Sequence, residues 1–137
     1  MYVYFLTIRS YRGLQFASVP DLSRRMVDSL IRCRERQDIR LYAYCLMPDH
    51  LHLAVSPLGG KTIPQVLQAY KSYTTREAWA VGHSGPLWQR SYYDHVARGD
   101  EDCVAICRYI LDNPVRKGLV AEAADWPWSD LVDPLPG

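Results

Sequence analysis

The sequence predicts an α+β domain of the ferredoxin-like split βαβ type, with a four-stranded antiparallel sheet, helices on one face and an added C-terminal helix. Strand-like and helix-like segments alternate in the order β-α-β-β-α-β-α. The second and third strands are separated only by a Pro-Asp turn, as in a hairpin. The length of 137 residues and the hydrophobic content of 48% fit a single domain, residues 1–137, with a normal core.

The first half of the chain supplies three strands and one helix. Residues 2–9 alternate in a way typical of a strand. Ser18–Asp21 resembles a helix start, and apolar residues then repeat at helical spacing over about 22–37. Residues 40–47 and 50–55 are rich in apolar residues and predict the two strands of the hairpin.

The second half supplies two helices and one strand. A threonine followed three residues later by glutamine, with proline between them, forms a capping box that predicts a helix over about 62–81. Residues 92–96 predict the fourth strand. A third helix is expected over 100–113, because the proline that follows disfavours helical backbone at the residue before it. The tryptophan-rich segment 125–129 is expected to clasp the body of the domain.

Composition excludes some classes of protein. No apolar run approaches the roughly 20 residues that span a bilayer, and the first residues lack the basic leader of a signal peptide. We therefore expect a protein of the cytoplasm, associated with the nucleoid if it acts on DNA, and no membrane partner. None of the four cysteines forms a CxxC pair, which favours buried core thiols over a zinc site.

The basic residues are mostly arginine, although the net charge is only +1. Arginine binds phosphate through a planar fork, and the ten tyrosines and four tryptophans offer faces on which bases can stack. A solvated helix face with ordinary core aromatics is the alternative interpretation. The candidates for contact with DNA are Arg24, Arg25, Arg32, Lys71, Arg76 and Arg90.

His50 and His52 flank a single leucine in a predicted strand. Because successive side chains of a strand alternate faces, both imidazoles point the same way. Two neighbouring imidazoles can hold one divalent metal ion. The alternative is an exposed strand face that carries two histidines.

Tyr109 and Asn113 are four residues apart on the third helix and therefore share a face. An amide oxygen suits magnesium or manganese, and a tyrosine oxygen can attack phosphorus as a covalent nucleophile. Tyr70, Tyr73, Tyr92 and Tyr93 lack an amide four residues on in the same helix, so core packing or base stacking is expected of them.

The motifs Met47–His52 and Tyr109–Val115, together in this order, resemble the HUH single-tyrosine transposases, the insertion-sequence-200-like family. Trp88–Arg90, Gly118–Val120 and Asp125–Ser129 resemble stretches of its REP-associated branch. The resemblance runs from about residue 2 to residue 129.

This resemblance implies cleavage and rejoining of single-stranded DNA at a hairpin through a 5′-phosphotyrosine intermediate. It implies that Tyr109 is the nucleophile, and that His50, His52 and Asn113 hold Mg²⁺ or Mn²⁺. The family often has glutamine where this chain has Asn113, and either amide can supply the oxygen. The protein would act as a monomer or homodimer.

Two other functions remain open. A non-catalytic module that binds single-stranded nucleic acid is one, since ferredoxin-like sheets with aromatic residues bind single strands. A small metal-dependent hydrolase that uses His50, His52 and His95 is the other. His95, next to Asp94, is either an auxiliary acid-base or ligand residue, or the partner in a structural hydrogen bond.

Overall fold

A five-stranded antiparallel sheet forms the centre of the computed structural model, which describes residues 1–136. Its strands are β1 (Tyr4–Arg9), β2 (Ile39–Leu46), β3 (His50–Pro57), β4 (Tyr93–Val96) and β5 (Ser129–Leu131). They lie in the order β4-β1-β3-β2-β5, and every neighbouring pair is antiparallel. The first four strands therefore have the order of the split βαβ fold that the sequence predicted.

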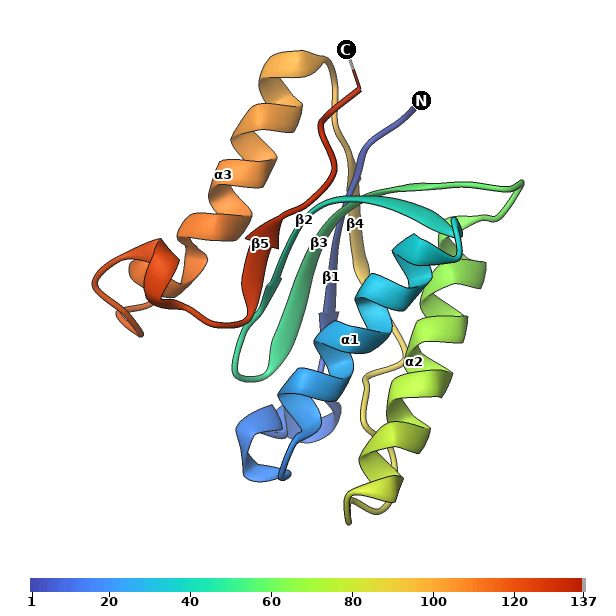
Figure 1. Ribbon diagram of the computed structural model, residues 1–137, viewed down its shortest axis with the longest axis vertical. Helices are drawn as coiled ribbons and strands as arrows, with labels where there is room; N and C mark the ends of the chain where they lie inside the picture. Colours follow the sequence, from blue (N-terminus) through green and yellow to red (C-terminus); the bar gives the residue numbers. More distant parts are fainter. Residues whose placement is uncertain (137) are drawn as a thin grey trace.

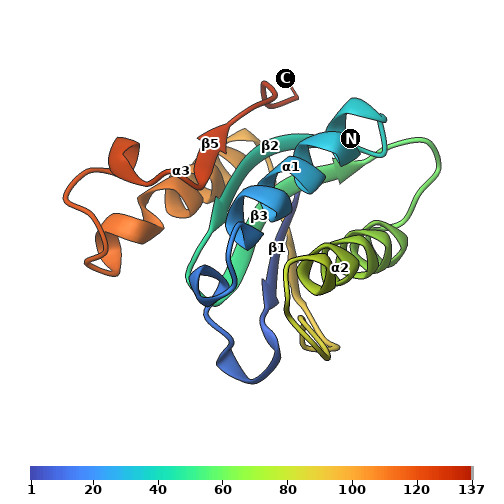
Figure 2. The same ribbon diagram turned by 60° about the horizontal axis from the view of Figure 1, so that its bottom comes forward.

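The three helices lie on both faces of the sheet (Figure 1). They are α1 (Leu22–Glu35), α2 (Ile63–Ala80) and α3 (Asp100–Arg116). Helices α1 and α2 cover one face and α3 covers the other, so that the sheet separates them (Figure 2). No helix among residues 1–136 is long and apolar enough to cross a bilayer.

Each face of the sheet has its own core. Leu51 and Leu53 of β3 point toward α1 and α2, where they join a cluster that includes Met26 and Leu67. The alternate residues of β3 point toward α3, where Ala54 packs in a second cluster with the buried side of that helix. This alternation puts the histidines of β3 on the α3 face.

Helix α2 begins as the sequence predicted. The Thr62 hydroxyl accepts from the Gln65 N–H, and the Gln65 side chain accepts from the Thr62 N–H, which completes a capping box. One side of this helix packs in the core, since Val66, Leu67 and Tyr70 are all buried.

Two expectations about these elements were wrong. Helix α1 begins at Leu22 rather than at the serine-proline segment, because Asp21 adopts a left-handed conformation and its carboxylate binds arginine side chains instead of capping the helix. The tail forms a fifth strand as well as a clasp, in which Trp126 Nε1 donates to the Leu46 carbonyl. The sheet consequently has five strands and not four.

Helix α3 continues through Pro114 to Arg116, although the sequence predicted an end at Asn113. Pro114 lies in the last turn, so its missing N–H removes only one helical hydrogen bond, and its ring is buried. The backbone continues beyond it, with the Lys117 N–H donating to the Asn113 carbonyl.

The four cysteines are free and buried, which confirms the prediction of core thiols. Burial raises the pKa of Cys45 to about 12 and raises the pKa of Cys107. These thiols therefore remain protonated and pack as small apolar side chains.

Candidate nuclease site

The histidine pair lies in the middle of the sheet on the face that α3 covers. Strand β3 pairs with β1 so that His50 is opposite Arg9 and His52 is opposite Thr7. The relative exposed areas of His50 and His52 are 9% and 5%. The strand therefore holds both imidazoles in a nearly dry environment.

The two imidazoles point their Nε2 atoms at each other, 3.1 Å apart. Each Nδ1 atom has a partner of its own: Asp49 Oδ1 lies 2.7 Å from that of His50, and Thr7 Oγ1 lies 2.8 Å from that of His52. A carboxylate only accepts, so His50 carries its proton on Nδ1 and presents a lone pair on Nε2. Such outer partners fix the tautomer and the orientation of metal-binding histidines.

Burial keeps the histidine pair neutral. Burial is the main cause that lowers the pKa of His52, which falls to about 3. Electrostatic repulsion by His50, Arg9 and Lys117 lowers this pKa further. Burial also lowers the pKa of His50, against the opposing effect of Asp49. At neutral pH both rings are therefore free bases, which is the form that binds metal ions.

Tyr109 extends from α3 to the edge of the histidine pair. Its ring centroid lies 5.8 Å from that of His52 and 5.7 Å from that of Phe5, both within the same chain. The side chain is 37% exposed, so the phenol is accessible from solvent. The Arg116 guanidinium lies over the ring, 4.3 Å from its centroid, in a cation–π contact.

Asn113 lies one turn beyond Tyr109 on the side of α3 that packs against the sheet. It is only 1% exposed, and neither Oδ1 nor Nδ2 has a hydrogen-bond partner among residues 1–136. A buried amide without partners is costly, about 1–3 kcal/mol, so it calls for a partner from outside the chain. The described residues contain no group of three or more His, Cys, Asp or Glu side chains that could hold a metal ion.

A cleft of about 600 Å³ opens between the sheet and α3 beside these residues. Thr7, Arg9, His52 and Tyr109 line it, together with Gln89 and the segment 91–93. Positive charge surrounds the cleft, because Arg9, Arg116 and Lys117 all act on His52 electrostatically. The cleft thus brings the Tyr109 phenol and the His52 imidazole together with cations that suit a phosphate group.

Those three cations were missed in the sequence. Arg116 follows Tyr109 by two helical turns, a spacing that could have indicated a shared face. Arg9 is placed beside His50 by the register between β1 and β3, which the sequence does not state.

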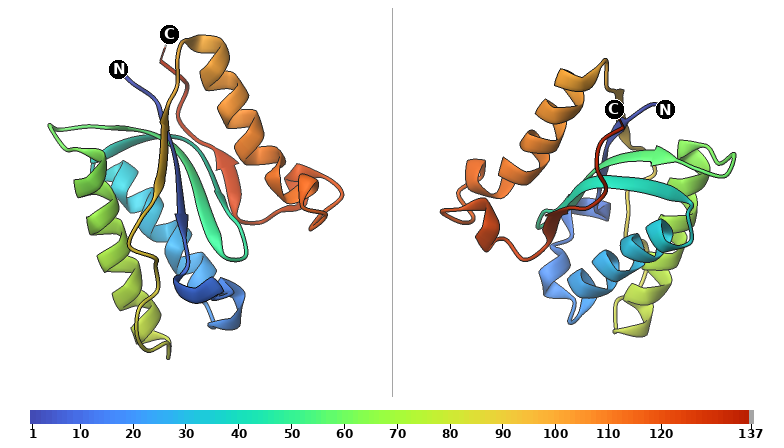
Figure 3. Two further views of the ribbon diagram at one scale, coloured as in Figure 1. Left: turned by 180° about the vertical axis from the view of Figure 1, so that it is seen from behind. Right: turned by 45° about the horizontal axis from the view of Figure 1, so that its top comes forward.

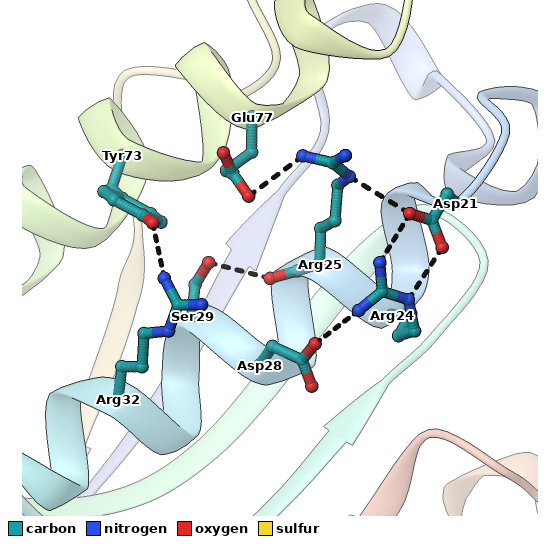
Figure 4. Close-up of polar contacts among 8 residues, drawn as sticks. All are labelled: Asp21, Arg24, Arg25, Asp28, Ser29, Arg32, Tyr73 and Glu77. Carbon is teal, nitrogen blue, oxygen red and sulfur yellow. Dashed lines mark hydrogen bonds and ion pairs between the residues drawn. The ribbon is translucent and has the colours of Figure 1, made fainter.

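The predicted arginines of α1 lie away from the cleft, because α1 covers the opposite face of the sheet (Figure 2). Arg24 and Arg25 are also neutralised by acids within the chain (Figure 4). Arg24 binds Asp21 and Asp28, and Arg25 binds Asp21 as well as Glu77 of α2. Arg32 donates to the Tyr73 hydroxyl. These contacts tie α1 to α2, so the expectation that all three arginines bind DNA has little support.

The remaining basic candidates lie on α2 and on the segment after it. Lys71 Nζ donates to the backbone carbonyls of Gln89, Arg90 and Ser91. Arg76 and Arg90 are exposed and line a second cavity.

The auxiliary pair predicted from the sequence does not form as expected. His95 Nε2 lies 3.4 Å from Asp102 Oδ2 in the first turn of α3, and the structure gives no contact between His95 and Asp94. Asp94 is exposed on β4. This polar contact favours the structural one of the two roles considered for His95.

Comparisons with known proteins found a family and several relatives that this chain resembles. The sequence model of the family described as "Transposase IS200 like" matches residues 1–113. A protein of Haemophilus influenzae that is described as a REP-associated tyrosine transposase is 31% identical over 109 residues, which cover 71% of this chain and 61% of the relative. The REP-associated tyrosine transposase of Escherichia coli is 26% identical over 102 residues, covering 74% of this chain and 59% of the relative. The chain thus spans about three fifths of the length of these relatives.

Two solved structures share the fold. A structure of a REP-associated tyrosine transposase bound to a REP hairpin superposes with a TM-score of 0.75 at 22% identity, covering 93% of this chain and 74% of that one. A protein of Deinococcus radiodurans R1 described as a transposase has a TM-score of 0.58 at 23% identity, covering 79% and 87% of the two chains.

Proposed function

This chain belongs to the IS200-like transposase family, and from that premise we propose that it cuts single-stranded DNA beside a hairpin and joins the cut end to another strand. The observation that carries the proposal is the approach of Tyr109 to His52 in one cleft, with 5.8 Å between their rings. A phenol beside a pair of metal-binding nitrogens is the arrangement that nucleophilic attack on a phosphodiester requires.

In the proposed reaction, Tyr109 Oη forms a bond to the phosphorus atom while the bond from phosphorus to the 3′ oxygen breaks. The phenol loses its proton and the leaving 3′ oxygen gains one, so the products are a 5′-phosphotyrosine and a free 3′ hydroxyl. A 3′ hydroxyl of a second DNA end then attacks the phosphotyrosine and restores the phenol. Because one phosphodiester replaces another, the exchange needs no nucleotide hydrolysis.

The histidine pair fits a divalent cation. Two ligand atoms at about 2.1 Å and at right angles around one ion lie about 3.0 Å apart, and the two Nε2 atoms here are separated by 3.1 Å. The buried, unpartnered amide of Asn113 supplies the kind of oxygen that Mg²⁺ or Mn²⁺ prefers. We propose that His50, His52 and Asn113 hold this ion, which when bound would polarise a phosphate oxygen and stabilise the charge that develops on it.

The cations of the cleft have a separate role in the proposal. Arg9, Arg116 and Lys117 place positive charge where the phosphodiester would lie. Arg116 also covers one face of the Tyr109 ring and so restricts its orientation. These contacts set affinity and position, whereas they carry no information about DNA sequence.

A hairpin is the proposed form of the DNA because a relative with this fold has been solved with a REP hairpin. Tyr109 reaches the histidine pair of its own chain, which supports cleavage by a single subunit. The contact between His95 and Asp102 argues against a hydrolase that uses three histidines.

The experiment uses a DNA hairpin with single-stranded flanks, labelled at its 3′ end and incubated with Mn²⁺. The proposal expects a protein-linked labelled fragment on a denaturing gel, because the 5′ phosphate of the 3′ fragment joins the tyrosine. Tyr109→Phe should lose this adduct. Tyr93→Phe is the matched control, since Tyr93 is an exposed tyrosine that lines the same cleft, and it should keep the adduct. Binding without any adduct would support the non-catalytic module instead.

A further inference from the structure

A second cavity of about 460 Å³ lies between α2 and the segment that leads from α2 to β4. We call it the α2 groove; Lys71, Thr75, Arg76, Trp79, Gln89 and Arg90 line it. The segment after α2 turns back and runs beside that helix (Figure 3), and the bonds from Lys71 Nζ to three of its carbonyls hold it there. The groove is therefore a built feature of the fold.

Trp79 offers an exposed aromatic face at this groove. Its side chain is 52% exposed, yet its orientation is fixed because Nε1 donates to the Gly85 carbonyl at 2.8 Å. Trp88 forms part of the floor and is itself held by a bond from Nε1 to Thr74 Oγ1. A large aromatic ring that is held in place and still open to solvent is suited to stacking on a nucleobase.

The groove also carries unneutralised positive charge. Arg76 and Arg90 are exposed, and within residues 1–136 neither forms an ion pair or a side-chain hydrogen bond. The arginines of the neighbouring helix α1 differ, because acids bind Arg24 and Arg25 (Figure 4). Arg76 and Arg90 thus remain free for an anionic partner.

The groove neighbours the cleft that holds Tyr109. Gln89 lines both cavities, and its N–H donates to the Arg9 carbonyl, which fixes it between them. A strand that leaves the cleft past Gln89 would therefore meet the groove next.

We propose that the α2 groove binds the single-stranded DNA next to the scissile phosphate, with a base stacked on Trp79 and phosphates held by Arg76 and Arg90. Stacking and phosphate contact together are the pattern of single-strand binding without strong sequence preference. The identity of the polymer as DNA rests on the proposed function. The groove would add contacts to the part of the DNA that lies outside the hairpin and the cleft.

The first test measures binding in a Tyr109→Phe background, so that no outcome depends on whether Tyr109 is the nucleophile. The probes are one DNA hairpin without a tail and the same hairpin with an oligothymidine tail of about ten nucleotides on its 5′ or 3′ side. The tail should tighten binding on one side, and Trp79→Ala should remove most of this gain, about tenfold. Trp79→Phe, which keeps a stacking face but loses the bond to Gly85, should retain most of it.

Charge is tested by the salt dependence of the same affinities. Arg76→Gln should lower the slope of log K against log salt by about 0.7 for the tailed hairpin, as expected when one phosphate contact to a single strand is lost. Trp79→Ala should leave the slope unchanged. Arg40→Gln is the matched control, because Arg40 is an exposed arginine at the far end of β2 and should not change either quantity.

The proposal is overturned if the tail adds no affinity, if Trp79→Phe loses as much as Trp79→Ala, or if Arg40→Gln weakens tail binding as much as Arg76→Gln. A crosslinking measurement tests independently whether the DNA tail lies in the α2 groove. A tail with 5-iodouracil at successive positions should crosslink on illumination to the peptide that contains Trp79. Crosslinks confined to peptides outside 71–90 would contradict the assignment, whereas loss of the tyrosine adduct alone would leave it intact.

Discussion

The Nε2 atoms of His50 and His52 face each other at 3.1 Å, while Asp49 and Thr7 hold the opposite nitrogen of each ring. Because the Asp49 carboxylate holds the His50 proton on Nδ1, the lone pair on His50 Nε2 points at His52 and needs a proton or a cation as its partner. The protein holds them there through the geometry of β3 and its pairing with β1. The residues around this pair therefore offer direct tests of whether it binds a metal ion.

We expect His50→Ala and His52→Ala each to lower DNA cleavage by more than about 100-fold, because each removes a proposed direct ligand rather than an outer partner. DNA binding should remain within a few-fold of the unmodified protein, since the cations of the cleft are unchanged. Adduct formation on a gel and fluorescence anisotropy measure the two quantities. Cleavage at the original rate in either variant would contradict the metal assignment.

Asp49→Asn should weaken the binding of the metal ion without removing a ligand. The carboxylate at 2.7 Å orients His50 and fixes its proton on Nδ1, and an amide can donate there and favour the wrong tautomer. We expect the Mn²⁺ concentration for half-maximal cleavage to rise about 10- to 100-fold. Asp130→Asn, at an exposed position of β5, is the control and should leave the Mn²⁺ titration unchanged.

Arg116→Gln should slow adduct formation more than it weakens binding. The guanidinium lies 4.3 Å from the centroid of the Tyr109 ring, so the variant frees the ring and removes a positive charge near the phosphate. We expect a decrease of about tenfold in the single-turnover rate. Arg108→Gln, an exposed arginine on the same helix that lines a different cavity, should show no decrease.

The acid stability of the protein should depend on Asp133. Its carboxylate binds Arg34 and accepts from the Leu41 N–H, and these contacts lower its pKa. A lowered pKa means that the stabilisation is present above the ordinary value of about 4 and is lost as pH falls through the lowered value. Asp133→Asn should therefore lower the urea midpoint at pH 7 and have a much smaller effect at a pH acid enough to protonate the carboxylate in the folded protein. A difference that stays constant with pH would contradict this cause.

Much of the site followed from sequence because it depends on local periodicity. The two-residue period of a strand put His50 and His52 on one face, and the four-residue spacing of a helix put Tyr109 and Asn113 on another. That the two faces meet requires α3 to pack on the opposite side of the sheet from α1 and α2, which the sequence did not predict. Only the resemblance to a known family implied that Tyr109 and the histidines belong to one site.

The parts that sequence did not predict depend on long-range packing. Thr7 becomes the partner of His52 through strand register across 45 positions, and Arg9 reaches the cleft in the same way. Pro114 looked like a helix end, although its burial in the last turn lets α3 continue. The arginines of α1 looked available for DNA, but they bind acids on their own helix and on α2, which composition alone cannot show.

The last prediction concerns the opposing demands of stability and function on Asn113. Its amide is buried without partners, so the metal-free protein bears a cost of about 1–3 kcal/mol that an apolar side chain of similar size would avoid. Asn113→Leu should therefore raise the urea midpoint of the metal-free protein while it abolishes cleavage. Mn²⁺ should raise the melting temperature of the unmodified protein, because a ligand that binds only the native state stabilises it, and should raise that of Asn113→Leu much less. Equal stabilisation of both proteins by Mn²⁺ would show that the amide is not a ligand, and a less stable metal-free variant would show that its polar atoms are already satisfied.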